Sequence, residues 1–145
     1  MKTVKDILTE KGSGVVTIRQ DQTIRDALGL LVNAGIGALV VVDDAGKVVG
    51  VFSERDCIRN VVIRKESVLD LLIKEVMSFP VLYVDPARTV DECMSLVTEK
   101  RCRHLPVMVD GELVGLVSIG DLVKATISEN ELLIQQLTHY IQTGG

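Results

Sequence analysis

The chain has 145 residues, of which 47% are hydrophobic and 25% are charged, a composition typical of soluble globular proteins. This length fits one domain or two very small ones. The net charge of −4 at pH 7 argues against a constitutive binder of nucleic acids or anionic membranes. Aromatic residues make up only 3% of the chain, which is too few to build base-stacking platforms for single strands.

Cysteine and histidine spacing excludes the common metal and disulfide frameworks. The three cysteines form no CxxC pair, and the two histidines lie 35 residues apart, so we expect neither a disulfide scaffold nor a metal site. The amino-terminal residues carry mixed charges and lack the apolar core of a signal peptide. The longest uncharged run, residues 27–42, holds 16 residues and is shorter than the ~20 residues of a membrane span. We therefore expect a cytoplasmic protein that does not contact membranes.

One pattern of residues occurs twice along the chain, with an offset of 66 residues from Thr23 to Thr89. A one-residue deletion in a turn shifts the later part of the second copy. The pairs of matching segments are 23–28 with 89–94, 39–42 with 105–108, 49–56 with 114–121, and the lead-ins 4–8 with 73–77. Because internal repeats are built as similar supersecondary units, we expect two copies of one small fold.

In chain order, the first copy predicts a strand, a helix, two strands and a second helix. The expected bounds are a strand over 15–18, a helix that begins after Thr23, strands over 38–42 and 48–52, and a helix that begins near Ser53. Thr23 with Asp26 has the pattern of a capping box. Apolar residues then recur at the spacing of one buried helical face, and a turn over 43–46 indicates a hairpin.

The second copy predicts the same order of elements. The expected bounds are a strand over 81–84, a helix after Thr89, strands over 105–109 and 113–117, and a helix near Ser118. The connector over 64–72 is expected to be helical. Ser128 and Glu131 form a further capping-box pattern, which predicts a separate amphipathic helix; it either docks on its own chain or forms a subunit interface.

These elements predict an α/β (α+β) protein with three parts. Residues 1–66 form the first repeat, 67–127 the second, and 128–145 an additional carboxyl-terminal helix and tail. A unit of about 55 residues is marginal on its own. We therefore expect the two sheets to pack face to face around a pseudo-two-fold axis.

The doubled motif Gly-hydrophobic-hydrophobic-Ser-x-x-Asp, at residues 50–56 and 115–121, resembles that of a tandem pair of CBS domains (a Bateman module). The resemblance covers residues 1–127 and implies a regulatory module that binds an adenosine nucleotide. AMP is the leading ligand, with ADP, ATP, NAD or S-adenosylmethionine as alternatives, and no cofactor is required. The resemblance also implies a homodimer whose ligand-dependent conformational change acts in trans on an unknown effector protein.

The residues of the motif suit a phosphorylated ligand. Gly50 and Gly115 lack a Cβ atom, so a ligand or another backbone can approach closely. Ser53 and Ser118 precede helices whose amino termini attract phosphate, and a carboxylate three residues later can accept hydrogen bonds from ribose hydroxyls. The alternative is that each Ser-x-x-Asp only caps a helix.

The resemblance places one nucleotide cleft on each side of the pair, with residues of both repeats in each. The first cleft would combine Arg101, Leu116, Ser118 and Asp121 with Gly14, Val16, Ile36, Gly37 and Ala38. The second cleft would combine Val51, Ser53, Arg55 and Asp56 with Pro80, Leu82, Cys102, Arg103 and His104. Gly35 stands where the second repeat has Arg101, a loss that Arg55, Arg103 and His104 partly offset. Arg55 and Gly120 precede the two motif aspartates, where the family sometimes has a hydroxyl residue, so the two clefts are expected to differ in affinity or ligand.

The basic cluster over residues 100–104 allows two interpretations, an anion pocket or a solvated loop at a helix end. Cys102 within it is expected to be a small apolar filler, although the adjacent arginines would lower its pKa.

No catalytic motif of the GxSxG, GxxxxGK or HExxH type occurs. The sequence therefore predicts a non-enzymatic ligand sensor, and the alternative is a dimerisation scaffold with degenerate pockets.

Overall fold

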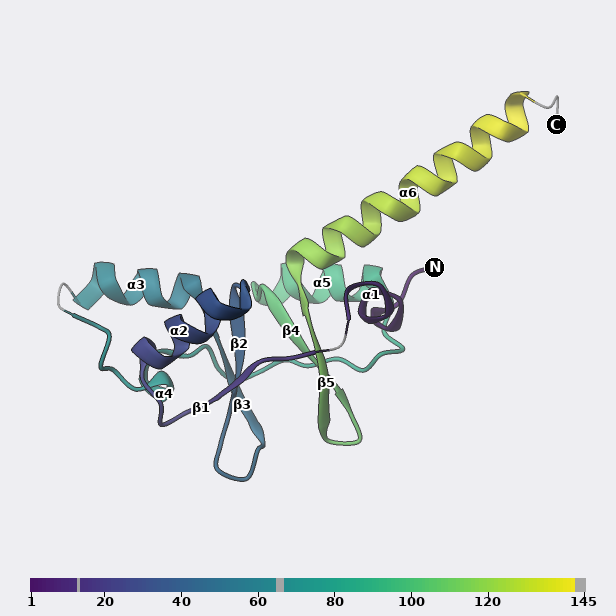
Figure 1. Ribbon diagram of the computed structural model, residues 1–145. Helices are drawn as coiled ribbons and strands as arrows, with labels where there is room; N and C mark the ends of the chain where they lie inside the picture. The colour runs from purple at the N-terminus through teal and green to yellow at the C-terminus, as the bar shows by residue number, and fades with distance from the viewer. Residues whose placement is uncertain (13, 65–66, 143–145) are drawn as a thin grey trace. The chain divides into compact units, whose positions relative to one another are not determined.

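The computed structural model describes residues 1–12, 14–64 and 67–142 and has the mixed α/β class expected from the sequence (Figure 1). The elements are α1 (Val4–Lys11), β1 (Thr17–Arg19), α2 (Ile24–Ala34), β2 (Ala38–Val42), β3 (Val48–Ser53), α3 (Glu54–Arg64), α4 (Ile73–Val76), α5 (Val90–Lys100), β4 (His104–Val109), β5 (Glu112–Ser118) and α6 (Ile119–Gln142). They form two compact units. The continuous unit is Gly14–Tyr83, and the split unit joins Met1–Ser13 to Val84–Gly145.

The continuous unit holds a three-stranded sheet of order β1-β2-β3, with β1 parallel to β2 and β2 antiparallel to β3. Thr23 and Asp26 form the expected capping box at the start of α2, and Gly35 ends the helix at a φ of 64°. The core of this unit gathers aliphatic side chains around Phe52, which is fully buried. Strand β1 begins at Thr17, two residues later than the expected start at residue 15, because Thr17 is the first residue that pairs in register with β2.

The split unit holds an antiparallel hairpin of β4 and β5, whose turn is made by Asp110 and Gly111 at φ values of 50° and 79°. Asp-Gly is favoured in such turns because both positions need a positive φ. Thr89 and Glu92 cap α5 as expected.

The strand expected over 81–84 is wrong, since only Val84 forms a bridge, to Val107. In the first repeat Val40 donates its N–H to the carbonyl of Val16 (3.2 Å) and so extends the parallel ladder. Pro106 stands at the position of Val40 in the second repeat, and proline has no N–H to donate.

The two lead-ins are exchanged between the repeats. Helix α4 of the second repeat belongs to the continuous unit, where Ile73 donates its N–H to the carbonyl of Gln22 (2.8 Å). Helix α1 belongs to the split unit, where Val4 donates in the same way to Arg88 (2.9 Å). The compact units therefore divide the chain differently from the expected boundaries at 66 and 127, although the repeat itself is unchanged.

The connector expected to be helical over 64–72 is not a helix at residues 67–72, and residues 65 and 66 lie outside the described part. Its backbone has another function. The carbonyls of Leu69 and Leu71 accept hydrogen bonds from the first-turn N–H groups of Arg25 (2.9 Å) and Ile24 (3.0 Å), while Val68 is buried in the core. These carbonyls satisfy donors that a helix amino terminus leaves unpaired.

The expected carboxyl-terminal helix is confirmed, but its expected start at Ser128 is wrong, because α6 runs unbroken from Ile119 to Gln142. No glycine or proline interrupts the sequence between residues 121 and 142, so Ser128 and Glu131 lie inside the helix instead of capping one. In the described part of the chain, none of the helices is both long and apolar enough to cross a membrane. The packing of one sheet on the other stays a prediction.

Candidate functional site

Both Ser-x-x-Asp motifs lie where a strand passes directly into a helix. Ser53 ends β3 and Ser118 ends β5, and each donates its backbone N–H to the Oδ2 atom of the aspartate three residues later at 2.9 Å. The aspartates therefore cap the helices α3 and α6. This capping uses the Oδ2 atom of each carboxylate, and the two aspartates differ in the hydrogen bonding of Oδ1.

Asp56 is occupied by its own unit. The residue is 2% exposed, and its Oδ1 atom accepts a hydrogen bond from the hydroxyl of Ser78 at 3.1 Å. The hydroxyl of Ser53 donates to Oδ2 at 3.2 Å, and the guanidinium of Arg59 lies 3.7 Å from Oδ1. Both carboxylate oxygens are thus engaged in this unit.

Asp121 is more open. Its side chain is 23% exposed, and Oδ2 accepts a hydrogen bond from the ammonium group of Lys11 at 2.7 Å. Lys11 also donates to the carbonyl of Leu116 at 2.8 Å. Among the described residues, Oδ1 of Asp121 has no hydrogen-bond partner, so a ligand hydroxyl could donate to it.

The pKa of the Asp121 carboxyl is set by opposing effects. Partial burial raises this pKa, but the hydrogen bond from Lys11 and those from Ser118 outweigh the burial and hold the pKa below its ordinary value. The carboxylate is therefore ionised at neutral pH, as an acceptor of ribose hydroxyls needs to be.

The basic cluster over residues 100–104 lies beside the first turn of α6. The carbonyl of Arg103 accepts the N–H of Ile119 at 2.9 Å, and His104 is paired with Ser118 across the hairpin. Arg101 follows α5 with a backbone φ of 54°. This left-handed conformation is rarely adopted by residues other than glycine. The split unit thus places the backbone of Arg103 beside the helix amino terminus that carries Asp121.

The two motif glycines serve mainly internal packing. A Cβ atom on Gly115 would lie 2.7 Å from a methyl carbon of Leu8, so the expectation of ligand access there is wrong. A Cβ atom on Gly50 would lie 2.5 Å from the sulfur of Met77 and 3.1 Å from the backbone oxygen of Ser78. The alternative of a closely approaching backbone is therefore confirmed at Gly50.

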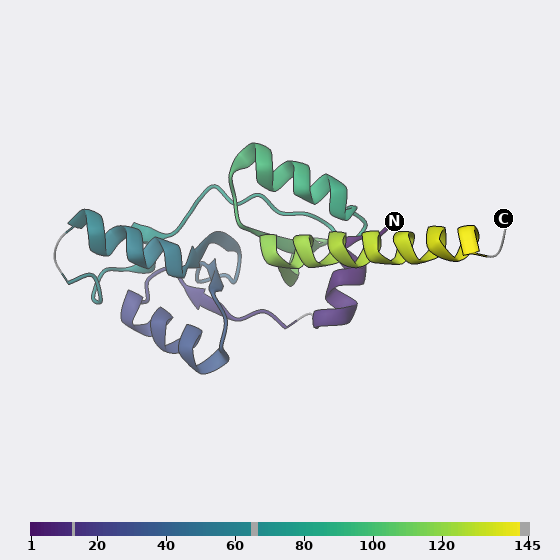
Figure 2. The same ribbon diagram turned by 90° about the horizontal axis from the view of Figure 1, so that it is seen from above.

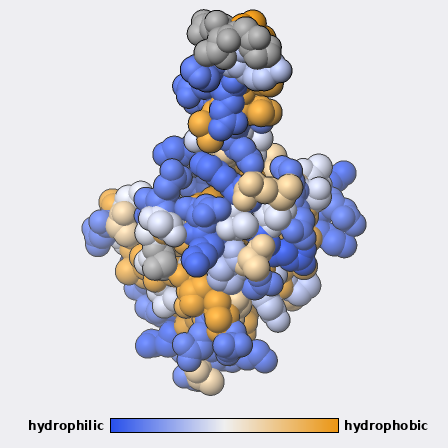
Figure 3. All heavy atoms as spheres, turned by 90° about the vertical axis from the view of Figure 1, so that its right-hand side faces the viewer, coloured by the Kyte–Doolittle hydropathy of each residue, from blue (hydrophilic) through white to orange (hydrophobic). Residues whose placement is uncertain are grey.

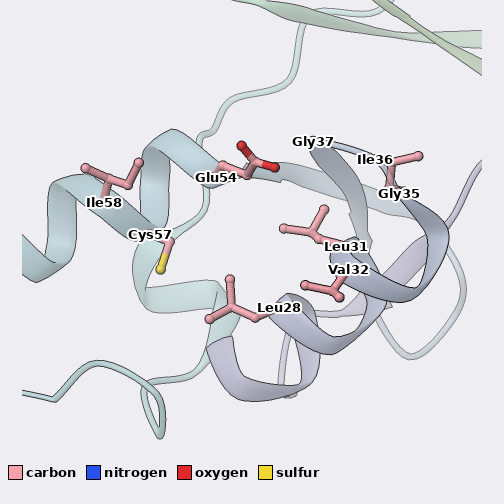
Figure 4. A pocket seen from close by; sticks show the side chains of 9 residues that line it. All are labelled: Leu28, Leu31, Val32, Gly35, Ile36, Gly37, Glu54, Cys57 and Ile58. Carbon is pink, nitrogen blue, oxygen red and sulfur yellow. The ribbon is translucent and has the colours of Figure 1, made fainter.

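Part of the first expected cleft lies at a pocket of the continuous unit. Ile36 and Gly37 line a cavity of about 640 Å³ between α2 and α3. The side chains of Leu28, Leu31 and Cys57 point toward one another across it (Figure 4). Its lining is apolar except for Glu54, so this pocket resembles a site for a hydrophobic group more than one for phosphate.

The expected clefts each draw on both units. The continuous unit holds Gly14, Val16, Ile36, Gly37, Ala38, Val51, Ser53, Arg55, Asp56, Pro80 and Leu82, and the split unit holds Arg101, Cys102, Arg103, His104, Leu116, Ser118 and Asp121. The union of the two halves into clefts stays a prediction.

Cys102 corrects one expectation. Burial raises the pKa of its thiol instead of the arginines lowering it, which agrees with its interpretation as an apolar filler. Within the described ranges, no three histidine, cysteine or acidic side chains gather as metal ligands.

Comparison with known proteins decides the family. A family model described as the CBS domain matches residues 4–63 and 73–128. The chain belongs to the CBS-domain family. It is 32% identical over 150 residues to the CBS domain-containing protein CBSX3, mitochondrial, of Arabidopsis thaliana. The alignment covers 98% of this chain and 73% of that relative.

Solved structures show the same CBS-pair fold. The crystal structure of the CBS domain NE2398 is 48% identical, with a TM-score of 0.79, over 87% of this chain and 98% of that one. CBSX2 was crystallised in complex with AMP; it is 27% identical, with a TM-score of 0.70, over 90% and 99% of the two chains. The CBS domain pair of protein MJ0100 was crystallised with 5′-methylthioadenosine and S-adenosylmethionine; it is 25% identical, with a TM-score of 0.77, over 89% and 98%.

Sequence reasoning missed two residues of this CBS pair, Lys11 and Ser78. Each lies just after a lead-in and hydrogen-bonds one motif aspartate of the other repeat. The signal was available, because the lead-ins match each other at residues 4–8 and 73–77. That match indicates that each lead-in has the same structural place, but it does not show which repeat it packs on.

Proposed function

We propose that this CBS pair is a regulatory module that binds an adenosine nucleotide at Asp121, with AMP as the leading ligand and NAD or S-adenosylmethionine as alternatives. The observation that carries the proposal is the open Oδ1 atom of Asp121 in the first turn of α6, a turn whose Ile119 N–H pairs with the carbonyl of Arg103. Adenosine ligands bound to CBSX2 and to the pair of MJ0100 support the ligand class.

Each part of the nucleotide has a chemical counterpart. A ribose hydroxyl donates to Oδ1 of Asp121. The phosphate is held by the positive end of the α6 dipole and by Arg101, since helix amino termini and guanidinium groups both favour phosphate. The N–H groups of Ile119 and Asp121 are already donated to Arg103 and Ser118. With an aromatic content of only 3%, the chain offers the adenine aliphatic side chains instead of aromatic rings.

The second cleft is proposed to bind more weakly. Both oxygens of Asp56 already accept hydrogen bonds within its unit, so a ribose would have to displace the hydroxyl of Ser78. This observation favours the scaffold alternative for the Asp56 cleft alone.

The module acts without catalysis, as a cytoplasmic homodimer that signals to a separate effector protein. A nucleotide can shift its conformational equilibrium only by binding one state more tightly than the other. The exposed apolar side chains of α3, among them Ile58, Val61 and Val62, support the dimer because such patches mark protein interfaces.

Thermal unfolding with a panel of ligands tests the proposal. AMP, ADP, ATP, NAD and S-adenosylmethionine are each added to the wild type and to Asp121→Asn. A ligand at 100 times its Kd should stabilise the wild type by about 2.7 kcal/mol and the variant much less. Asp26→Asn is the matched control, because Asp26 occupies a capping box of the same form without a ligand role. If no ligand raises the Tm of the wild type, the scaffold alternative replaces the sensor.

A further inference from the structure

The carboxyl-terminal half of α6 extends beyond the rest of the split unit, as two perpendicular views show (Figure 1, Figure 2). The family match ends at residue 128, so this half is an addition to the CBS pair. Every residue from Asn130 to Ile141 is exposed. The space-filling view shows hydrophobic side chains beside hydrophilic ones at this projecting end (Figure 3).

Five of the exposed large apolar residues of α6 follow a heptad pattern, whereas Ile119, Leu132, Leu133 and Tyr140 lie off it. Spacings of four and three residues alternate along one stripe, which consists of Val123, Ile127, Asn130, Ile134, Leu137 and Ile141. The five apolar members are between 42% and 74% exposed. The helix packs on its own unit through a different face, which carries the buried Leu122 and Ala125. Isoleucine and leucine at alternating core positions are typical of a two-stranded coiled coil.

The lack of charged residues along much of this stripe favours a second copy of the chain as its partner. Residues 132–142 contain no aspartate, glutamate, lysine or arginine, so a second copy can align in register without like charges meeting. A membrane surface fits poorly, because amphipathic membrane helices carry lysine and arginine on their polar face. A partner of opposite charge has no charges to pair with here.

Asn130 selects the orientation. In a parallel, in-register pair, Asn130 meets the same residue of the second copy, and the two amides can hydrogen-bond to each other. In an antiparallel pair centred on the stripe, it would face Ile134 and lose that partner. With Ile127 and Ile134 at a positions, Asn130 lies at a d position, where the two side chains of a parallel, in-register pair face each other.

We propose that the stripe of α6 forms a parallel, in-register two-stranded coiled coil with a second copy of this chain. The coil is separate from the ligand site. It assigns to the additional half of α6 one contact of the homodimer proposed above, and it rests on that dimer but not on nucleotide binding.

Disulfide cross-linking of the full chain tests this contact. Leu137→Cys places a thiol on the stripe, where a parallel pair brings identical residues within disulfide range. Gln136→Cys is the matched control on the other side of the helix. Under mild oxidation at micromolar concentration, we expect the Leu137→Cys dimer to form at least tenfold faster than the control dimer. The wild type measures the background from its own three free cysteines and should form a dimer no faster than the control. Equal rates for the two variants would overturn the proposal.

Sedimentation provides an independent measurement. The double variant Ile134→Asp with Leu137→Asp should raise the Kd of the dimer at least tenfold, while Gln136→Asp leaves it unchanged. An unchanged Kd in the double variant would contradict the coil. If the wild type dimerises and Leu137→Cys fails to cross-link, only the coil is wrong. A monomeric wild type refutes both the coil and the homodimer. In either case, ligand-dependent Tm shifts still report on the nucleotide site.

Discussion

Replacing Gly50 with alanine tests the packing of α4 against β3. The added Cβ atom would lie 2.5 Å from the sulfur of Met77 and 3.1 Å from the backbone oxygen of Ser78. The sulfur belongs to a flexible side chain and can move. The oxygen of Ser78 cannot move freely, because it accepts the N–H of Val51 at 3.1 Å, and Ser78 donates back to Val51 at 2.9 Å.

The expected cost follows from this difference. Overpacking a tight site costs about 1–3 kcal/mol, and the fixed carbonyl of Ser78 places Gly50 in the middle of that range, at about 2 kcal/mol. The alanine also reduces the entropy of the unfolded chain, which returns about 0.5 kcal/mol. At about 3 °C per kcal/mol for a chain of this size, the Tm of Gly50→Ala should fall by about 5 °C.

Thermal unfolding followed by circular dichroism measures the change. Gly29→Ala is the matched control, because Gly29 lies within α2 with no heavy atom within 4 Å of an added Cβ. Alanine at such a helix position should raise the free energy of unfolding by about 1 kcal/mol. The reasoning is refuted if Gly50→Ala keeps the wild-type Tm or shifts it in the same direction as Gly29→Ala.

Three further variants probe the two aspartates and the basic cluster. Ser78→Ala removes the hydroxyl that donates to Asp56 and should lower the free energy of unfolding, measured in urea, by about 1.5 kcal/mol; a loss no larger than that of Thr9→Ala, at the matching position of the other lead-in, would contradict this. Lys11→Met removes a cause of the lowered pKa of Asp121. A carboxyl whose pKa is lowered by folding stabilises the protein above its unfolded pKa of about 3.9, and this stability is lost as the pH falls through the folded pKa. Between about pH 5 and pH 3, Lys11→Met should therefore lose less stability than the wild type. The difference is up to about 1 kcal/mol, because the pair is partly exposed. A wild-type pH profile would show that Lys11 does not act on Asp121. Arg101→Gly relieves the left-handed φ of 54° and should add about 1 kcal/mol of stability while weakening AMP binding; unchanged AMP affinity would remove Arg101 from the site.

The repeat and most of its elements were predictable because local signals dominate them. The capping boxes at Thr23 and Thr89 and the Asp110-Gly111 turn are encoded in adjacent residues, and all three are confirmed. The errors came from partners distant in sequence. Residues 67–72 form a turn instead of a helix, and the carbonyls of Leu69 and Leu71 pair with the start of α2. Pro106 removes a donor that the first repeat uses between strands.

The site was predictable only in part. The motif located both aspartates at helix amino termini, but it could not show that Ser78 closes one of them and Lys11 holds the other. Those partners lie 22 and 110 residues away from the aspartates, and no local spacing relates them. The expectation that the two clefts differ rested on Arg55 and Gly120, the residues before the two aspartates. The structure adds a second reason in the different hydrogen bonding of Asp56 and Asp121.

Isothermal titration calorimetry of AMP tests the central proposal most directly. The account predicts that Asp121→Asn weakens AMP binding at least tenfold, which corresponds to about 1.4 kcal/mol, because the amide replaces a charged acceptor of the ribose hydroxyl. The control Asp26→Asn should bind AMP with the wild-type Kd. Equal Kd values for the wild type and Asp121→Asn, with AMP bound in both, would contradict the assignment of Asp121 as the ribose acceptor.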